Sequence, residues 1–506
     1  MRDQFVTRII AIAALLALAG GAGLGGSSPT TVHAAPPSNA SAFTPMTPQR
    51  LVDTRTGLGG VGGRLTAEAS VDVQVTGKLG IPDTASAVML NVTAVDSGGR
   101  GYLQVVPRGR AALRSSSTLN VDAPGQTIPN AAFAPIGDAG QITVFTTFAT
   151  DLVIDVSGYF LPAQTAAAGR LQPLTPNRIL DTRIALGWTP PSTTAPPTTA
   201  PTPTTTTTTT TQPPTTQPST TVKPSNPGDT KNCSDFATYA AAKAYFDMYF
   251  PYYGDVAKLD NDNDGEPCES LPGGPGVRAI RSDVVAGSTI IPLQVAGRGG
   301  VPTDGVSAVV MNVTAVDPTG PGYVQVAPRP VTIGASSNLN VATGLTIANL
   351  VVVPLGAGGQ VDLYTTTNME LLADVVGYFT SASASSSSTG LFVPITPSRQ
   401  LDTRDPAGTQ PVRASGTILQ TDVSDVAANA IAIAGNATVT DSVQFGYLQV
   451  AAPPLNPGAS SNVNVAYNGQ TIANAVVSPV SGGAVSTFNN SPMHEILDVT
   501  GWFTQS

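Results

Sequence analysis

One nine-residue phrase occurs three times in this chain of 506 residues, and the triplication limits the fold more than any other feature. The phrase is Thr-Pro-x-Arg-x-x-Asp-Thr-Arg, and it occupies residues 47–55, 175–183 and 396–404. Each occurrence is followed by Asn-x-Thr, then Gly-Tyr-x-Gln-Val, and finally Asp-x-x-Gly with two aromatic residues. The first and third copies are about 115–120 residues long, which is the size of a compact domain rather than of a short solenoid unit.

The segments within each copy have the pattern of β-strands. Runs such as 102–106 and 142–146 are rich in β-branched and aromatic residues, and Gly, Pro, Asn and Asp separate such runs. We therefore predict a mainly β protein with three tandem antiparallel β-sandwich-like domains, in preference to barrels. The triplicate resembles a β-domain repeated in secreted actinobacterial proteins. That resemblance implies an architecture and a location but no activity.

The second copy is interrupted by about ninety residues. A Thr/Pro-rich tract, which cannot bury a core and is expected to be disordered, fills part of the gap, and a small module follows it. The predicted organisation is a signal peptide at 1–34, copy one at 42–162, copy two at 171–187 plus 273–380, the Thr/Pro-rich linker at 188–230, the module at 231–272, a Ser-rich linker at 381–390 and copy three at 391–506.

The first 34 residues have the features of an export signal. Arg2 and Arg8 flank the start, residues 9–18 are apolar, and Val32-His33-Ala34 offers a cleavage point. We expect cleavage, with an uncleaved anchor as the alternative, and no other segment is apolar and long enough to cross a bilayer. The net charge of −9 and the scattered Lys and Arg give no basic stripe, so we expect no nucleic-acid partner.

The module contains an acidic run that has the composition of a calcium loop. Asp260, Asp262 and Asp264 alternate with Asn, Gly265 permits a sharp turn, and Glu269 follows. Ca²⁺ binds six to eight such oxygens. We predict that these four carboxylates bind Ca²⁺ by side chain and that Glu266 binds it through its carbonyl. The match to an EF-hand is partial, because position twelve is Leu271, which cannot bind a metal. A solvated turn without metal and weak millimolar binding remain alternatives.

The same run, together with an upstream Asn232–Phe236 segment, resembles the Excalibur calcium-binding domain of bacterial extracytoplasmic proteins. The resemblance covers about forty residues. It implies a small Ca²⁺ module with a cysteine bridge and implies no enzyme. Cys233 and Cys268 are the chain's only cysteines, and in an exported protein such a pair indicates one disulfide. Between them we predict a helix at 237–249, capped by Ser234 or Asp235.

Catalysis by the repeats has little support in the sequence. His33 lies in the leader and His494 belongs to the third copy alone, so a Ser-His-Asp site is not expected. A two-carboxylate glycosidase site could in principle use Asp53 with Asp155. Three such sites in one chain would be unusual, and we expect no enzymatic activity. We interpret Asp-Thr-Arg as a structural turn or a partly buried ion pair, with Arg55 bound to Asp155.

Two other repeated features each have two interpretations. Asn91, Asn312 and Asn436 lie in glycosylation sequons, and we expect their side chains to bond turns or neighbouring backbone instead of carrying glycans. The second set precedes the closing phenylalanines, and we expect packing there in preference to a sugar-stacking platform: Tyr159, Tyr378 and Trp502.

These patterns together favour a secreted or cell-surface protein that binds calcium and has a structural or adhesive role. The competing hypothesis is a protein that uses its three β-domains to bind cell-wall or extracellular glycan. The expected partners are calcium and, under the second hypothesis, cell-wall or extracellular glycan, and the expected location is outside the cell in association with the envelope.

Overall fold

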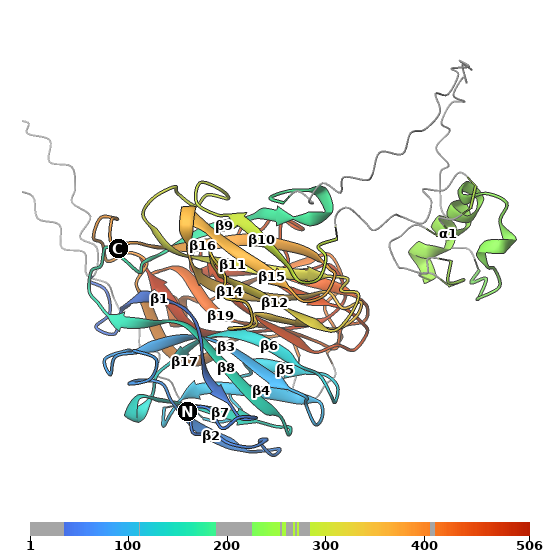
Figure 1. Ribbon diagram of the computed structural model, residues 1–506. Helices are drawn as coiled ribbons and strands as arrows, with labels where there is room; N and C mark the ends of the chain where they lie inside the picture. The colour runs from blue at the N-terminus through green and yellow to red at the C-terminus, as the bar shows by residue number, and fades with distance from the viewer. Residues whose placement is uncertain are drawn as a thin grey trace, which may run out of the picture.

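The computed structural model describes residues 35–110, 112–188, 225–253, 256–259, 267–268, 271–272, 284–404 and 410–505. Strands hold 50% of the residues and helices 6%, which confirms the predicted mainly β fold. The strands gather in one body, and the helix α1 (Tyr239–Tyr253) lies apart from them (Figure 1). A second, short helix is α2 (Ser424–Ala427). Within the described ranges no helix is long and apolar enough to cross a membrane.

The first eight strands form two antiparallel layers of four strands that pack face to face, and β1 also pairs with β17 (Phe392–Asp402) of the third sandwich, so the first layer continues into an eight-stranded sheet. One sheet, in the order β6-β3-β8-β1, comprises β1 (Ser41–Asp53), β3 (Ala87–Val95), β6 (Ile128–Pro135) and β8 (Asp151–Pro162). The other, in the order β2-β7-β4-β5, comprises β2 (Ser70–Gln74), β4 (Gly101–Pro107), β5 (Leu119–Val121) and β7 (Gln141–Thr146). Leu90 of β3 and Leu103 of β4 belong to one core cluster, so this unit is a β-sandwich.

The same strand order occurs twice more. The second sandwich joins sheets β14-β11-β16-β9 and β10-β15-β12-β13, with β9 (Leu171–Asp181), β10 (Thr289–Gln294), β11 (Val306–Val316), β12 (Gly322–Pro328), β13 (Leu339–Val341), β14 (Ile347–Pro354), β15 (Gln360–Thr365) and β16 (Glu370–Thr380). The third joins β22-β19-β24-β17 and β18-β23-β20-β21, with β17 (Phe392–Asp402), β18 (Thr417–Asp422), β19 (Ala430–Thr440), β20 (Gly446–Ala451), β21 (Val463–Val465), β22 (Ile472–Pro479), β23 (Ala484–Asn489) and β24 (His494–Thr504).

One sheet of each sandwich is buried on both faces. Along β3, Val88 and Leu90 face the core of their own sandwich, whereas Met89 belongs to a cluster shared by all three sandwiches. Side chains of a strand alternate between its two faces. Two buried faces therefore require a nearly continuous apolar run, and such a run is present in β3 and β11.

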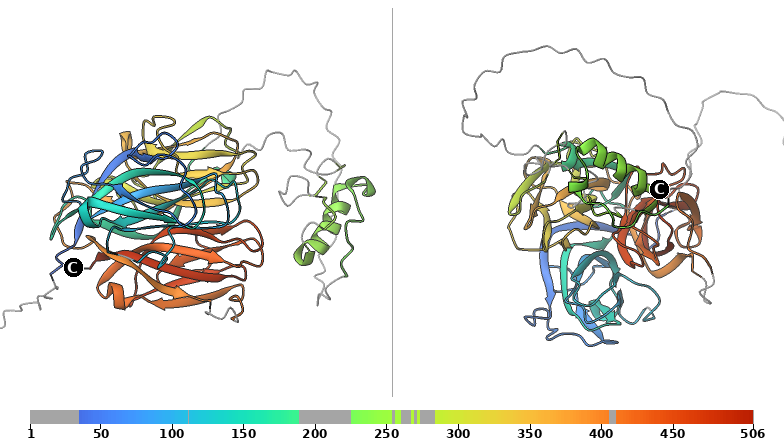
Figure 2. Two further views of the ribbon diagram at one scale, coloured as in Figure 1. Left: turned by 90° about the horizontal axis from the view of Figure 1, so that it is seen from below. Right: turned by 90° about the vertical axis from the view of Figure 1, so that its right-hand side faces the viewer.

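The shared cluster lies where the three sandwiches meet. The right-hand view of Figure 2 shows them arranged around a common centre. Each contributes the fully buried phenylalanine of its closing phrase: Phe160, Phe379 and Phe503. Ring centroids of Phe43 and Phe379 are 4.4 Å apart, and those of Phe160 and Phe392 are 4.5 Å apart. Aromatic contacts therefore join different copies of the repeat.

An asparagine pair crosses each interface between two sandwiches. The donor nitrogen and the acceptor oxygen lie in different sandwiches in every pair: Asn349 to Asn91 at 2.9 Å, Asn474 to Asn312 at 2.8 Å, and Asn130 to Asn436 at 2.9 Å. The three acceptors also donate to backbone carbonyls, each at 2.7 Å: Asn91 to Ser337, Asn312 to Ser461, and Asn436 to Ser117. These side chains do bond backbone, as expected, but it is the backbone of the next copy.

The two connections between sandwiches, residues 163–170 and 381–391, are bonded to each other. Arg170 donates to the carbonyls of Ser385 at 2.7 Å and Thr389 at 3.3 Å, and Ala166 pairs with Ser387. Trp188, which we assigned to the Thr/Pro-rich linker, packs against the core of the second sandwich. The other predicted domain boundaries stay predictions, because the leader and most of the linker lie outside the described residues.

Candidate functional site: the disulfide-closed module and the repeated arginine network

The helix of the module begins two residues later than predicted. The backbone N–H of Ala241 donates to Oγ1 of Thr238 at 3.3 Å, so Thr238 caps α1. Asp235 is bound elsewhere: its carboxylate accepts from the backbone N–H of Asn232 at 2.8 Å and closes the short 3-10 turn η3 (Cys233–Asp235). The predicted cap by Ser234 or Asp235 was therefore wrong, because that segment forms a separate turn before the helix.

A disulfide joins Cys233 to Cys268, with the Cα atoms 5.3 Å apart. This confirms the predicted pairing. Cys268 is buried, and so is Leu259. The N–H of Cys268 donates to the carbonyl of Leu259 at 2.9 Å. These residues pack with Ala242 and Phe246 of α1 in a small apolar cluster, so the helix, the disulfide and the ends of the acidic run form one unit.

The predicted calcium ligands lie outside the described residues. They are Asp260, Asp262, Asp264, Glu266 and Glu269. The described residues on either side of residues 260–266 are Leu259 and Pro267. The hydrogen bond from Cys268 to Leu259 holds the described residues on the two sides of this segment next to each other. The carboxylate and carbonyl donors of the segment are hard oxygens of the kind that Ca²⁺ prefers. In the part of the chain that the structure does describe, no group of three or more His, Cys, Asp or Glu residues is placed to hold a metal.

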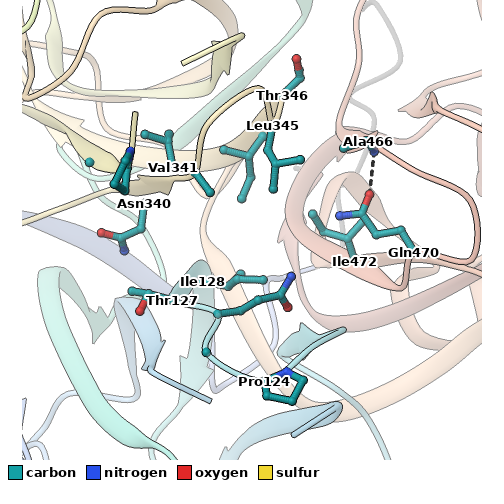
Figure 3. Close-up of a pocket in the computed structure, with 16 residues that line it drawn as sticks. Pro124, Thr127, Ile128, Asn340, Val341, Leu345, Thr346, Ala466, Gln470 and Ile472 are labelled. Carbon is teal, nitrogen blue, oxygen red and sulfur yellow. Dashed lines mark hydrogen bonds between the residues drawn. The ribbon is translucent and has the colours of Figure 1, made fainter. Parts of the chain in front are cut away.

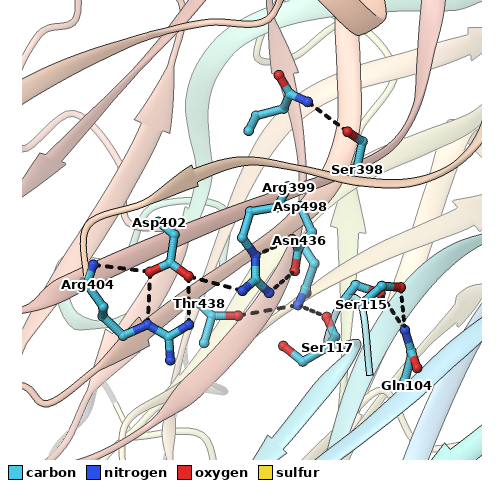
Figure 4. A network of polar contacts seen from close by, with 12 residues as sticks. Gln104, Ser115, Ser117, Ser398, Arg399, Asp402, Arg404, Asn436, Thr438 and Asp498 are labelled. Carbon is cyan, nitrogen blue, oxygen red and sulfur yellow. Dashed lines mark hydrogen bonds and ion pairs between the residues drawn. The ribbon is translucent and has the colours of Figure 1, made fainter. Parts of the chain in front are cut away.

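The repeated phrase forms an arginine–aspartate network. Arg50 of β1 lies directly opposite Asp155 of β8 in the strand register, and its Nε is 2.6 Å from the carboxylate. The equivalent pairs have the same register and similar Nε–Oδ1 distances: Arg178–Asp374 at 2.8 Å and Arg399–Asp498 at 2.9 Å. Figure 4 shows the third copy, where Arg399 lies between Asp498 and Asp402. The arginine of each pair is the fourth residue of the phrase.

The predicted ion pair between Arg55 and Asp155 was wrong. Arg55 bonds Asp53 instead, with Nε–Oδ1 at 2.8 Å and Nη2–Oδ2 at 2.7 Å. Arg55 follows the end of β1, where the chain turns back so that Asp53 and Leu58 pair. It therefore reaches the carboxylate two residues earlier, while Arg50 already occupies Asp155. The repeated phrase contains Arg50, but the sequence alone did not indicate its partner.

The two carboxylates of the network differ in electrostatics. The hydrogen bond from Arg55 lowers the pKa of Asp53 to about 2. Burial raises the pKa of Asp155, although its hydrogen bond to Arg50 opposes the shift. Both side chains are buried, and both are hydrogen-bonded to guanidinium groups. The arrangement joins the first strand of the sandwich to its last strand and to the turn that follows β1.

The aromatic residues before the closing phenylalanines pack inside the molecule. Tyr159 and Tyr378 are half-buried and contact the cores of the first and second sandwiches, and Trp502 contacts the core of the third. Each lies on the strand face opposite to its neighbouring phenylalanine, which faces the shared cluster. These contacts are those of packing residues, as the sequence analysis expected.

Sequence reasoning missed the asparagines that complete the interfaces. Asn130, Asn349 and Asn474 close the phrase Thr-Ile-x-Asn at the start of β6, β14 and β22. The sequence did contain a signal, because an asparagine recurs at the same position of every copy within a strand-like apolar segment. Its partner could not be named, since the partner belongs to another copy.

Comparison with known proteins identifies the module. Residues 230–269 match the Excalibur calcium-binding domain family. An uncharacterized protein of Pasteurella multocida (strain Pm70) is 50% identical over 42 residues, which are 8% of this chain and 54% of that protein. This chain thus spans about half the length of that relative. A solved structure described as the triple jelly roll fold and turret assembly in an archaeal virus covers 92% of this chain and 90% of its own, at 8% identity and a TM-score of 0.15. So low a score supports no structural argument.

Proposed function

We propose that this chain is a secreted or cell-surface calcium-binding protein with a structural or adhesive role. The observation that carries the proposal is that the two ends of the acidic segment are held together. Within the region that matches the Excalibur family, the Cys233–Cys268 disulfide and the Cys268–Leu259 hydrogen bond fix the end of the acidic segment next to its beginning. A stable disulfide also favours an oxidising compartment outside the cytoplasm.

The acidic residues between Leu259 and Cys268, together with Glu269 immediately after Cys268, have defined roles in this proposal. Asp260, Asp262, Asp264 and Glu269 bind Ca²⁺ with their carboxylates, and Glu266 binds it with its carbonyl. The bound ion neutralises carboxylates that repel one another. Because the ends of the acidic segment are already held together, the chain loses less conformational entropy on binding than an open segment would.

The three sandwiches serve as a rigid platform for the module. Their shared phenylalanine cluster and their crossed asparagine pairs hold them together. We propose no catalytic role for them. Support comes from Asp53 and Asp155, whose carboxylates are both engaged by arginine side chains. Measurable glycoside hydrolysis that disappears in Asp53→Ala or Asp155→Ala would contradict this part of the proposal.

The test is a calorimetric Ca²⁺ titration of the whole oxidised protein. We expect one site per chain, and an affinity at least about tenfold lower in Asp262→Ala, since one carboxylate ligand is lost. Asp229→Ala is the matched control. Asp229 is a half-exposed carboxylate just before the module and pairs with Lys258 inside it, and we expect its removal to leave the affinity unchanged. Absence of binding by the oxidised wild type would overturn the calcium proposal.

The adhesive role needs a separate measurement. We expect the protein to be retained on whole bacterial cells in Ca²⁺ and released by a chelator, with Asp262→Ala retained poorly in either condition. Calcium binding without any calcium-dependent retention would leave a structural role and remove the adhesive one.

A second candidate function is glycan binding by the β-domains. The observation that favours it is a cavity where all three sandwiches meet, lined by residues of each. Retention on insoluble peptidoglycan or polysaccharide that a chelator does not disturb would support this function.

A further inference from the structure

A cavity of about 380 Å³ lies at one end of the junction between the sandwiches (Figure 3). Its walls are three equivalent turns, which join β5 to β6, β13 to β14 and β21 to β22. The three turns are residues 122–127, 342–346 and 466–471. The volume falls in the range of small-molecule sites. It exists only because three copies assemble, so it is a property of the whole body and of none of the sandwiches alone.

The floor of the cavity is apolar. It includes the first residues of β6, β14 and β22, which are Ile128, Ile347 and Ile472. None of the described residues that line the cavity is charged. Nearby, Arg100 is neutralised by Asp122 at 3.3 Å. A charged ligand would lose its hydration here without gaining a partner of opposite charge, so the cavity selects an uncharged one.

The three turns are not identical, and the difference shapes the cavity. The second turn has five residues, 342–346, whereas the first and third have six each, 122–127 and 466–471. Leu345 of the second turn stands where the others have Gln126 and Gln470. One wall is thus shorter and more apolar than the other two, which suits a ligand with one apolar side and one polar side.

Two side-chain amides supply hydrogen-bond donors. Oε1 of Gln470 accepts from the backbone N–H of Ala466 at 2.6 Å, which leaves its Nε2 pointing into the cavity (Figure 3). Oδ1 of Asn340 accepts from Ser337 Oγ at 3.3 Å, and its buried Nδ2 has no hydrogen-bond partner within the described residues. An unpaired buried donor is costly. The terminal torsion of asparagine is soft, so Nδ2 can turn toward an acceptor in the cavity.

We propose that this cavity binds the acetamido group of a neutral N-acetylated sugar. The acetamido carbonyl accepts from Asn340 and Gln470, and its methyl group packs on the isoleucine floor beside Leu345. The group has no charge, one strong acceptor and one small apolar end, which are the three properties that the lining requires. The inference rests on the second candidate function, glycan binding, and gives that function a site and a ligand class.

The test is a titration of the intact calcium-loaded protein with N,N′-diacetylchitobiose, in which binding is measured by calorimetry or saturation-transfer NMR. Cellobiose, which lacks acetamido groups, and glucosamine, which is charged, are the comparison ligands. We expect binding of the acetylated sugar, and binding of the other two at least about tenfold weaker, since each loses the acceptor.

Two variants locate the site. Asn340→Leu removes the unpaired donor, and we expect a loss of about tenfold or more in affinity. Asn464→Leu is its matched control. Asn464 occupies the same place in β21 and accepts from Ser461 in the same way at 3.3 Å, but it does not line the cavity. Leu345→Trp fills the cavity from a half-buried position, and we expect it to abolish binding.

The outcomes separate the site from the function. Sugar binding that survives both Asn340→Leu and Leu345→Trp would overturn the site and keep glycan binding. Retention on polysaccharide without affinity for any acetylated sugar would overturn the ligand class. Binding of a neutral acetylated peptide in place of the sugar would overturn the identification as a glycan. Absence of both sugar binding and polysaccharide retention would overturn the second candidate function itself.

Discussion

At the scale of single residues, strand register decides which arginine binds which aspartate. The repeated phrase contains two arginines and one aspartate, and the closing phrase adds another aspartate. Because Arg50 lies opposite Asp155 across the β1–β8 pair, it forms the long-range ion pair. Arg55 lies beyond the end of the strand and bonds Asp53. The Arg50–Asp155 pair links the first strand of the sandwich to its last strand, and the Arg55–Asp53 pair stabilises the turn after β1.

Arg50→Met tests the long-range pair. Asp155 is buried, so loss of its partner leaves an uncompensated buried carboxylate, and we expect a destabilisation of about 2–4 kcal/mol. Arg108→Met is the control, because its pair with Asp72 is exposed on both sides, and we expect less than about 1 kcal/mol there. Urea unfolding of the two variants would measure both. Equal effects would show that burial does not matter here.

Acid unfolding tests the shorter-range pair. The pKa of Asp53 is about 2 in the folded protein and about 3.9 in an unfolded chain. The contribution of ionised Asp53 to the free energy of unfolding is therefore complete above about pH 4, and it is lost as the pH falls toward 2. Because Arg55 is half exposed and solvent weakens the pair, we expect a contribution on the order of 1 kcal/mol.

The measurement compares urea midpoints of the wild type and Asp53→Asn from pH 7 to pH 2. The stability difference between them should shrink below pH 4, because only the wild type has an Asp53 carboxylate whose stabilising charge is lost on protonation. Asp138→Asn removes an exposed carboxylate and serves as the control. A difference that stays constant across the whole pH range would contradict the assignment.

At the scale of elements, the module combines the helix α1, a disulfide and an acidic segment whose two ends are held together. It has few apolar residues of its own, with Ala242, Phe246, Ala257, Leu259 and Cys268 forming its buried cluster. Such a small core cannot stabilise a fold without a further link. The disulfide closes a segment of 35 residues. It therefore supplies a large part of the module's stability.

We expect the double variant Cys233→Ser/Cys268→Ser to lose roughly 3–4 kcal/mol of module stability, from the entropy of the opened loop. Hydrogen exchange of the α1 amides should accelerate, and Ca²⁺ affinity should fall. The melting of the sandwiches should not change, since the link lies within the module. Ser234→Ala, an exposed position beside Cys233, is the control. Unchanged exchange in the double variant would show that the helix does not depend on the disulfide.

At the scale of the whole molecule, three similar sandwiches form one body. Each interface has the same asparagine pair, and the pairs run from the first sandwich to the second, from the second to the third, and from the third back to the first. The aromatic cluster is likewise shared by all three. This closed arrangement satisfies buried amides that a single sandwich would leave without partners.

Asn349→Ala tests that arrangement. Asn349 donates to Asn91 and to the carbonyl of Asn338, and it accepts from the backbone N–H of Ala131. Its removal leaves buried groups unpaired on two sandwiches, so we expect a loss of at least about 2 kcal/mol. Scanning calorimetry should show a single transition for the sandwiches of the wild type and a lower, broader one in the variant. The control is Asn456→Ala, an exposed position. A profile identical to the wild type would argue that the sandwiches fold independently.

The sequence by itself determined the β class, the triplication, the disulfide pairing and the Excalibur segment. These depend on local signals: strand-length apolar runs, repeated phrases, a pair of cysteines and a short acidic motif. The tertiary structure decided which arginine reaches Asp155, which copy receives each asparagine, and where the cavity forms. The physical reason is that the same residue types recur in every copy. Composition and period place a side chain on a face, but only strand register and the packing of the copies select its partner.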